Sequence, residues 1–531
     1  MASSGSNWGS RTVTDDGAVV AAVRTADRGS RAAGGRAFTP DATDQRRPAA
    51  SLVRGGLSLL STQPVTWTAS LLAAVLVPRY LGDEGLGHYA VVITLANLAG
   101  LVASLGVPNY LRRQIARQPD RVAGLGSTAL ALSLVSAFAV AALLLAATAL
   151  LGHRAPQAAP LTIALLGMIV GAPQTVLFSL FVGQERHARF AWLNAAAATG
   201  STAAGIAVLV LGGDLIAYMV AGLVASGVVT LASWRSAGFR LARAALAPSL
   251  LLDLARCGLP FLGWNVALQV YGEVDKLLLG AMAQDAVVGW YAAAYRIISI
   301  PGFIPTLIIT PLLPVLARCA GDVPLARQTL RQSLVVALVL TVPLCGLIVA
   351  TAPAIPGLLG WPPPFEHAVP LLQILALHIP LVAVDMVLGT ALIALGREHK
   401  WLIVGIVAAV FNPALNLLCI PYFEHQAGNG AIGAAVVTVL TELLMLTGAL
   451  VLMPSGLLER AFLGVSARIG LAAVCLVGVA AAILTLSLPL AVIGGGLAYL
   501  SALLALGVVT VDDLGAARRL TRGALGRHSV D

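Results

Sequence analysis

Apolar runs of about 20 residues recur along this chain, and each is long enough to cross the hydrocarbon core of a bilayer as a helix. Within a bilayer a helix satisfies every backbone hydrogen bond inside one segment, whereas barrel strands read as short alternating segments. The sequence therefore predicts an all-α polytopic membrane protein with about 14 transmembrane helices. The predicted spans lie near 57–78, 87–107, 126–151, 160–182, 190–211, 214–233, 258–281, 288–313, 332–352, 368–395, 401–421, 431–453, 466–487 and 489–510.

The composition supports a membrane protein and argues against several other classes. Charged residues make up 11% of the chain, against roughly 25% in soluble domains. The formal charge of +9 comes from arginines at the ends of spans, so topology explains it better than nucleic-acid binding. The five cysteines show no CxxC spacing. We expect no disulfide framework, no metal, no cofactor and no nucleic acid.

The distribution of basic residues predicts the orientation in the membrane. If the amino terminus is cytoplasmic, the inner loops and adjoining span ends hold most of the arginines, including Arg112, Arg117, Arg327 and Arg331. The outer loops then hold only Arg79 and Arg154. By the positive-inside rule, both termini should be cytoplasmic.

A repeated pattern indicates two related halves. Gly87-His-Tyr-Ala90 leads through an apolar run to Arg117, and Gly289-Trp-Tyr-Ala292 leads through a similar run to Arg318. Because six spans separate the repeats, both enter the membrane in the same sense, which is typical of parallel repeats with a substrate path between them. The predicted organisation is a disordered cytoplasmic tail (1–53), an amino-terminal six-helix lobe (54–234), a cytoplasmic linker (235–256), a second six-helix lobe (257–455), two additional transmembrane helices (456–511) and a cytoplasmic tail (512–531).

Several stretches resemble the Wzx-type polysaccharide flippase family of the MOP transporter superfamily. In the first half these are Arg79-Tyr-Leu-Gly-Asp-Glu-Gly-Leu-Gly-His-Tyr-Ala90, Ser104-Leu-Gly-Val-Pro-Asn109 and Arg113-Gln-Ile-Ala-Arg117. In the second half they are Asp275-Lys-Leu-Leu-Leu-Gly280, Gly289-Trp-Tyr-Ala-Ala-Ala-Tyr-Arg296 and Pro314-Val-Leu-Ala-Arg318. The resemblance covers about residues 55–455.

The resemblance implies a transporter in the bacterial inner membrane. Such a protein moves an undecaprenyl-pyrophosphate-linked oligosaccharide to the periplasmic leaflet by alternating access. Its partners would be the lipid-linked oligosaccharide and membrane lipids, with polysaccharide polymerase and chain-length machinery as further partners. Lipid II flippases, which are similar, usually carry more arginines in the first spans than this chain, where Gln63 and Trp67 occupy the interior of the first span.

The seventh span carries the main predicted site. Asn265, Gln269 and Lys276 fall within about 40° of one another at helical spacing, with Glu273 at the flank of that face. Arg296 on the eighth span should reach a similar depth. Under the resemblance, Lys276 and Arg296 would receive the diphosphate, and Glu273 or Asp275 would tune the charge or accept a coupling proton. Alternatively, Glu273 pairs with Lys276 and Asp275 with Arg296 for packing alone.

Other polar residues inside spans are secondary candidates. Asp385 and Glu442 could form a protonatable relay or bond to helix backbone. Gln63 and Trp67 could line the cavity or bond between helices. The pair Asn412 and Asn416 could line the cavity, although carbonyls freed by Pro413 are the slightly favoured partners. His378 is expected to be a packed histidine.

Two alternative functions stay open at this point. A cation-coupled small-molecule exporter of the same superfamily should have a carboxylate cluster in its first half, but the first six spans hold no interior Asp or Glu. A membrane glycosyltransferase or polymerase could use Asp83 and Glu84, but the outer loops are too short for an acceptor-binding domain. We therefore expect a transporter and not an enzyme.

Overall fold

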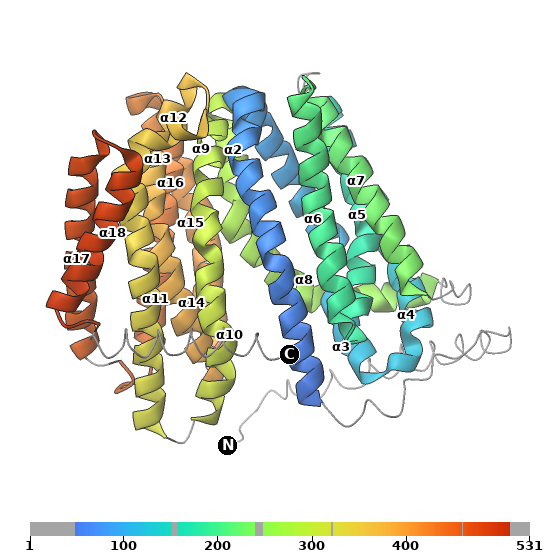
Figure 1. The fold of residues 1–531 in the computed structure, drawn as a ribbon. Coiled ribbons are helices and arrows are strands. Elements are labelled where there is room, and N and C mark those ends of the chain that lie inside the picture. The colour runs from blue at the N-terminus through green and yellow to red at the C-terminus, as the bar shows by residue number, and fades with distance from the viewer. Residues whose placement is uncertain (1–47, 151–157, 239–247, 320–321, 459, 510–531) are drawn as a thin grey trace, which may run out of the picture. The chain divides into compact units, whose positions relative to one another are not determined.

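The computed structural model describes residues 48–150, 158–238, 248–319, 322–458 and 460–509. Within these residues the chain forms α-helices and short 3-10 turns and has no strand, so the predicted all-α fold is confirmed (Figure 1). Both predicted tails, apart from residues 48–53, and residues 239–247 of the predicted linker lie outside the described residues.

Two compact units divide the chain. Unit 1 comprises the described residues up to Leu81 together with His88–Glu273, and unit 2 comprises Gly82–Gly87 together with the described residues from Val274 onward. The boundary falls inside helix α8, so α8 contributes to both units. The predicted lobe boundaries and the parallel relation of the halves stay predictions.

Unit 1 is built from long helices that pack side by side, with α5, α6 and α7 adjacent to one another (Figure 1). Its core includes Leu111 and Ile115 of α3, Leu177 and Phe181 of α5, and Leu254 of α8, all of them buried. The helices of unit 1 are α2 (Pro48–Ala103) apart from its residues Gly82–Gly87, α3 (Val107–Arg117), α4 (Val122–Leu150), α5 (Ala158–Gly183), α6 (His187–Val210), α7 (Leu215–Ala237) and the first part of α8 (Pro248–Met282).

Unit 2 has a core formed by α10, α11, α14 and α16, in which Leu316, Leu334, Leu388 and Ala449 are buried. The last two helices, α17 and α18, pack on each other, and α17 packs beside α11 (Figure 1). The helices of unit 2 after α8 are α9 (Asp285–Ser299), α10 (Phe303–Arg318), α11 (Val323–Thr351), α12 (Ile355–Leu359), α13 (Val369–Ala376), α14 (His378–Ala394), α15 (Glu398–Ala427), α16 (Gly430–Leu452), α17 (Arg460–Leu484) and α18 (Leu488–Ala505).

The predicted spans correspond to helices, with three differences in continuity. In the described residues, 12 helices are long and apolar enough to cross a membrane. One of them, in α2, holds both of the first two predicted spans and is kinked at Gly82, whose φ of 69° lies outside the helical region. The predicted span 288–313 is broken by a 3-10 turn around Pro301, which lacks a backbone N–H. The predicted span 368–395 is divided at Leu377 into α13 and α14.

The two repeated motifs meet each other within unit 2. A Cβ atom at Gly87 would overlap the carbonyl oxygen of Asp285, and a Cβ atom at Gly289 would overlap the carbonyl oxygen of Asp83. The Asp83 carboxylate also accepts a hydrogen bond from Trp290 Nε1 at 3.0 Å. The glycines therefore permit a reciprocal backbone crossing, and Asp83 has a structural partner there.

Candidate functional site

A cavity of about 850 Å³ lies within unit 1. Its walls come from α2, α3, α4, α5, α6, α7 and α8. Arg112 is the only charged residue among the described residues that line it, and no Asp, Glu, Lys or His lines it. The polar lining residues are Tyr89, Asn97, Ser104, Asn109, Arg112, Ser133, Gln174, Thr175, Ser201, Thr202, Tyr218, Ser226, Asn265 and Gln269.

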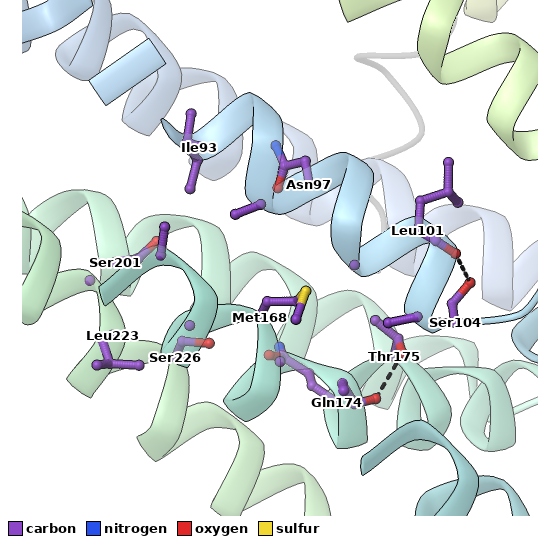
Figure 2. Close-up of a pocket in the computed structure, with 18 of the residues that line it drawn as sticks. Ile93, Asn97, Leu101, Ser104, Met168, Gln174, Thr175, Ser201, Leu223 and Ser226 are labelled. Atoms are coloured by element: carbon purple, nitrogen blue, oxygen red, sulfur yellow. Dashed lines mark hydrogen bonds between the residues drawn. The ribbon is translucent and has the colours of Figure 1, made fainter. Parts of the chain in front are cut away.

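Small residues on α5 and α7 make the room for this cavity. Gly167 and Gly171 stand one helical turn apart on α5, and Gly222 lines the cavity from α7. A Cβ atom at any of these three glycines would meet nothing within 4 Å. Figure 2 shows Asn97 of α2 on one side of the cavity and Met168 of α5 on the other.

Several hydroxyl groups in the cavity are already bonded as donors. Ser104 donates to the carbonyl of Leu101 at 2.7 Å, and Thr175 donates to the carbonyl of Ala172 at 2.8 Å (Figure 2). Ser201 and Thr202 likewise donate to carbonyls one turn earlier, each at 2.8 Å. Because a hydroxyl has one hydrogen and two lone pairs, these groups can still accept. With the side-chain amides, which both donate and accept, the lining can match a hydroxyl-rich ligand.

Arg112 supplies the positive charge of the cavity from α3. Partial burial lowers the pKa of its guanidinium, but an arginine side chain in a protein keeps its proton near neutral pH. The neighbouring Arg113 lies 6.0 Å from the ring centroid of Phe261 and does not line the cavity. One cation and many neutral polar groups therefore characterise this site.

Some of the predicted site residues in unit 1 line this cavity and others do not. Asn265 and Gln269 line the cavity, as their shared helix face suggested. Gln63, Trp67 and Glu273 are half-buried and are not among its lining residues, so their roles stay predictions.

In unit 2, Asp275 is 4% exposed and sits at the centre of a polar network. Its Oδ2 accepts hydrogen bonds from Tyr291 at 2.9 Å and Thr438 at 3.0 Å, and its Oδ1 accepts one from Asn416 Nδ2 at 2.7 Å. The packing alternative that paired Asp275 with Arg296 is therefore wrong among the described residues. Neutral hydroxyl and amide donors replace the guanidinium.

The same network holds Asn412 and Asn416, which are both buried on α15. Asn416 donates to Asn412 Oδ1 at 3.0 Å, and Asn412 Nδ2 is 3.4 Å from Thr441 Oγ1. Their side chains therefore bond to other side chains, and not to the carbonyls around Pro413 that we favoured. The network joins α8, α9, α15 and α16 inside one unit.

The predicted cations of unit 2 have different local contacts. The Nζ atom of Lys276 lies 5.0 Å from the ring centroid of Tyr295, within the range of a cation–π interaction. Arg296 is half-buried in the last turn of α9. The role of these two residues in diphosphate binding stays a prediction.

A second acidic group lies between α14 and α16. Asp385 and Glu442 are 4% and 1% exposed, and the two carboxyl groups interact electrostatically. His378 Nδ1 lies 3.3 Å from Glu442 Oε1, so this histidine contacts a carboxylate and is not simply packed. No group of three or more His, Cys, Asp or Glu residues in the described chain could hold a metal ion.

Comparison with known proteins identifies the family and the fold. The model of the family "Polysaccharide biosynthesis protein" matches residues 52–320, about half of the chain, and the MatE family model matches residues 260–418. None of the curated proteins compared matches the chain.

Two solved structures share the fold of this chain. The lipid II flippase MurJ, in an inward closed conformation, is 15% identical with a TM-score of 0.64, and the match covers 85% of this chain and 98% of MurJ. An inward-facing multidrug resistance MATE family transporter of the MOP superfamily is 16% identical with a TM-score of 0.57, covering 74% of this chain and 98% of the transporter. The chain belongs to the polysaccharide biosynthesis protein family.

Proposed function

We propose that this protein is a flippase that moves an undecaprenyl-pyrophosphate-linked oligosaccharide across the bacterial inner membrane for surface polysaccharide biosynthesis. It would work by alternating access between two parallel six-helix lobes, with both termini in the cytoplasm. The observation that carries this proposal is the unit 1 cavity, whose described lining holds hydroxyl and amide groups and the cation of Arg112.

The chemistry of the cavity fits the head group of such a substrate. A sugar presents many hydroxyl groups that both donate and accept, and the amides of Asn97, Asn265 and Gln269 can do the same. The diphosphate is anionic, and an arginine can bind phosphate oxygens through paired hydrogen bonds. The volume of about 850 Å³ lies within the usual range for ligand sites, roughly 300–1,000 Å³.

The same cavity weighs against a carrier of cationic small molecules. An organic cation in a low-dielectric site requires a negative partner, and the described lining of this cavity provides none. The second candidate function is nevertheless a cation-coupled small-molecule exporter, because the fold is shared with a MATE transporter and unit 2 holds buried carboxylates.

Unit 2 would supply coupling and further positive charge. We assign coupling to Asp275, whose charge state would alter hydrogen bonds to three other helices, and the pair Asp385 and Glu442 would be a second proton-accepting group. Lys276 and Arg296 are the proposed additional cations for the diphosphate.

Replacing Arg112 by alanine is expected to reduce flipping about ten- to hundredfold, because a hydrogen bond to a charged group contributes about 1.5–3 kcal/mol. The measurement is the amount of lipid-linked oligosaccharide in the inner leaflet of a deletion strain that carries each variant at equal membrane abundance. Arg113→Ala is the matched control, since Arg113 lies outside the cavity lining. The variants Lys276→Ala and Arg296→Ala test the unit 2 cations in the same assay.

The outcomes separate the parts of this proposal. Inner-leaflet accumulation in the deletion strain that wild type rescues and Arg112→Ala does not would support both the flippase and the cavity. Rescue by Arg112→Ala would leave the flippase standing and remove the role of Arg112. No accumulation after deletion, with surface polysaccharide unchanged, would favour small-molecule export.

A further inference from the structure

The unit 1 cavity is long in one direction. Its lining residues on α2 run from Tyr89 to beyond Leu101, and those on α5 run from Ile163 to Thr175. From Tyr89 to Leu101, and again from Ile163 to Thr175, a helix rises about 18 Å. Figure 2 shows Ile93 towards one end of the cavity, and Leu101 and Thr175 towards the other. A ligand that fills the cavity therefore meets two separate ends.

The positive charge enters the cavity from one of these ends. A Cβ atom at Gly183, the last residue of α5, would lie 3.1 Å from the carbonyl oxygen of Arg112. Gly183 follows Thr175 along α5 by a helical rise of about 12 Å, so the backbone of Arg112 lies beyond Thr175. Because Arg112 is the only charged residue of the described lining, we call this the Arg112 end.

Two tyrosines line the opposite end, which we call the Tyr89 end. The rings of Tyr89 on α2 and Tyr218 on α7 pack edge to face, with centroids 5.3 Å apart and an interplanar angle of 79°. Gly205 on α6 makes room for the second ring, because a Cβ atom there would lie 2.5 Å from Tyr218 Cε2. The edge-to-face contact covers at most one face of the Tyr89 ring. Packing therefore holds an aromatic side chain at the wall of the cavity.

The space beside this pair is open and its described lining is uncharged. Gly222 lines the cavity one turn after Tyr218 on α7, and a Cβ atom there would meet nothing within 4 Å. Ser201 and Thr202 line the cavity from α6, and their oxygens can accept hydrogen bonds. A sugar ring has hydroxyl groups at its edge and C–H groups on its faces, and the electron-rich face of an aromatic ring attracts such C–H groups. The Tyr89 end therefore matches a neutral sugar ring.

We propose that the Tyr89 end is a subsite for a sugar ring that lies remote from the diphosphate, with Tyr89 as its stacking platform. This inference rests on the proposed function and adds an orientation to it. The diphosphate binds at the Arg112 end, and the sugar chain extends along the cavity towards Tyr89. A single sugar next to the diphosphate is much shorter than about 18 Å, so only a longer chain reaches the subsite.

Two ligands of different length test the subsite on the full-length protein in detergent. One is the lipid-linked oligosaccharide purified from the deletion strain, and the other is the same lipid diphosphate carrying only its first sugar. Tyr89→Ala should weaken binding of the oligosaccharide about tenfold and leave the affinity for the single-sugar ligand unchanged. Tyr89→Phe should keep both affinities, because the ring is retained. Arg112→Ala should weaken both ligands by the same factor.

Tyr80→Ala is the matched control, since Tyr80 is an exposed tyrosine of the same helix that is not among the lining residues. Gly222→Leu is a second test that leaves the tyrosine pair intact. Its side chain would fill the open space, so it should weaken the oligosaccharide and spare the single-sugar ligand.

The outcomes separate this subsite from the function on which it rests. Equal weakening of both ligands by Tyr89→Ala, or unchanged affinity of Tyr89→Ala and Gly222→Leu for the oligosaccharide, would overturn the subsite alone. Failure of the wild-type protein to bind either ligand would remove the proposed function and the subsite with it.

Discussion

Replacing Gly289 by alanine is expected to destabilise the protein by about 3 kcal/mol, at the upper end of the range for overpacking. The new Cβ atom would overlap the backbone carbonyl oxygen of Asp83, which cannot rotate away as the end of a side chain can. The crossing would have to separate, and the Trp290 to Asp83 hydrogen bond would be strained with it. Membrane abundance and the apparent melting temperature of the detergent-solubilised protein are the measurements.

The reciprocal position provides a sharper form of this prediction. Gly87→Ala should cost about as much, because its Cβ atom would overlap the carbonyl oxygen of Asp285 at the same crossing. If one substitution already separates the two segments, the second should add little, so the double variant should be less than additive. Gly405→Ala on α15 is the control, since a Cβ atom there meets nothing within 4 Å and alanine favours the helix. Equal stability of Gly289→Ala and the control would contradict the close crossing.

The crossing also shows what sequence reasoning could and could not reach. The two motifs were recognisable as repeats because the same residue types recur at the same spacing. That they touch each other depends on how residues 82–87 of α2 pack against α9 inside unit 2, and no local pattern in either motif encodes that contact. The long apolar runs predicted the spans well. The two breaks lie beside prolines, Pro301 in the first and Pro380 three residues after Leu377 in the second, and neither break was predicted.

Site residues that share one helix could be predicted from their spacing, whereas site residues on separate helices could not. Asn265 and Gln269 lie four residues apart on one helix, so their spacing alone predicts that they share a face, and both line the cavity. Gln174 and Ser226 are single polar residues on separate helices and become a site only when those helices pack. The positive-inside rule accounts for every arginine at the cytoplasmic end of a span. It therefore could not identify Arg112 as the arginine of α3 that lines the cavity.

Replacing Asp275 by asparagine is expected to leave the protein folded and to reduce transport at least about tenfold. Asparagine has nearly the same shape, and its Oδ1 can still accept from Asn416. The hydroxyl groups of Tyr291 and Thr438, which lie 3.2 Å apart, can reorient to accept from the new Nδ2 group. Packing is therefore retained, while the carboxylate that could gain and lose a charge is removed.

The comparison with Asn416→Leu separates coupling from stability. That variant keeps the carboxylate but removes one of its buried donors, so it should lower stability by about 1–3 kcal/mol and affect transport mainly through abundance. Transport per folded molecule, measured together with melting temperature, therefore distinguishes the two roles. If Asp275→Asn flips substrate at the wild-type rate across pH, the network only holds α8, α9, α15 and α16 together. If it folds normally and fails to transport, the charge of Asp275 is required for transport. Its three hydrogen bonds would then connect a change in that charge to α9, α15 and α16.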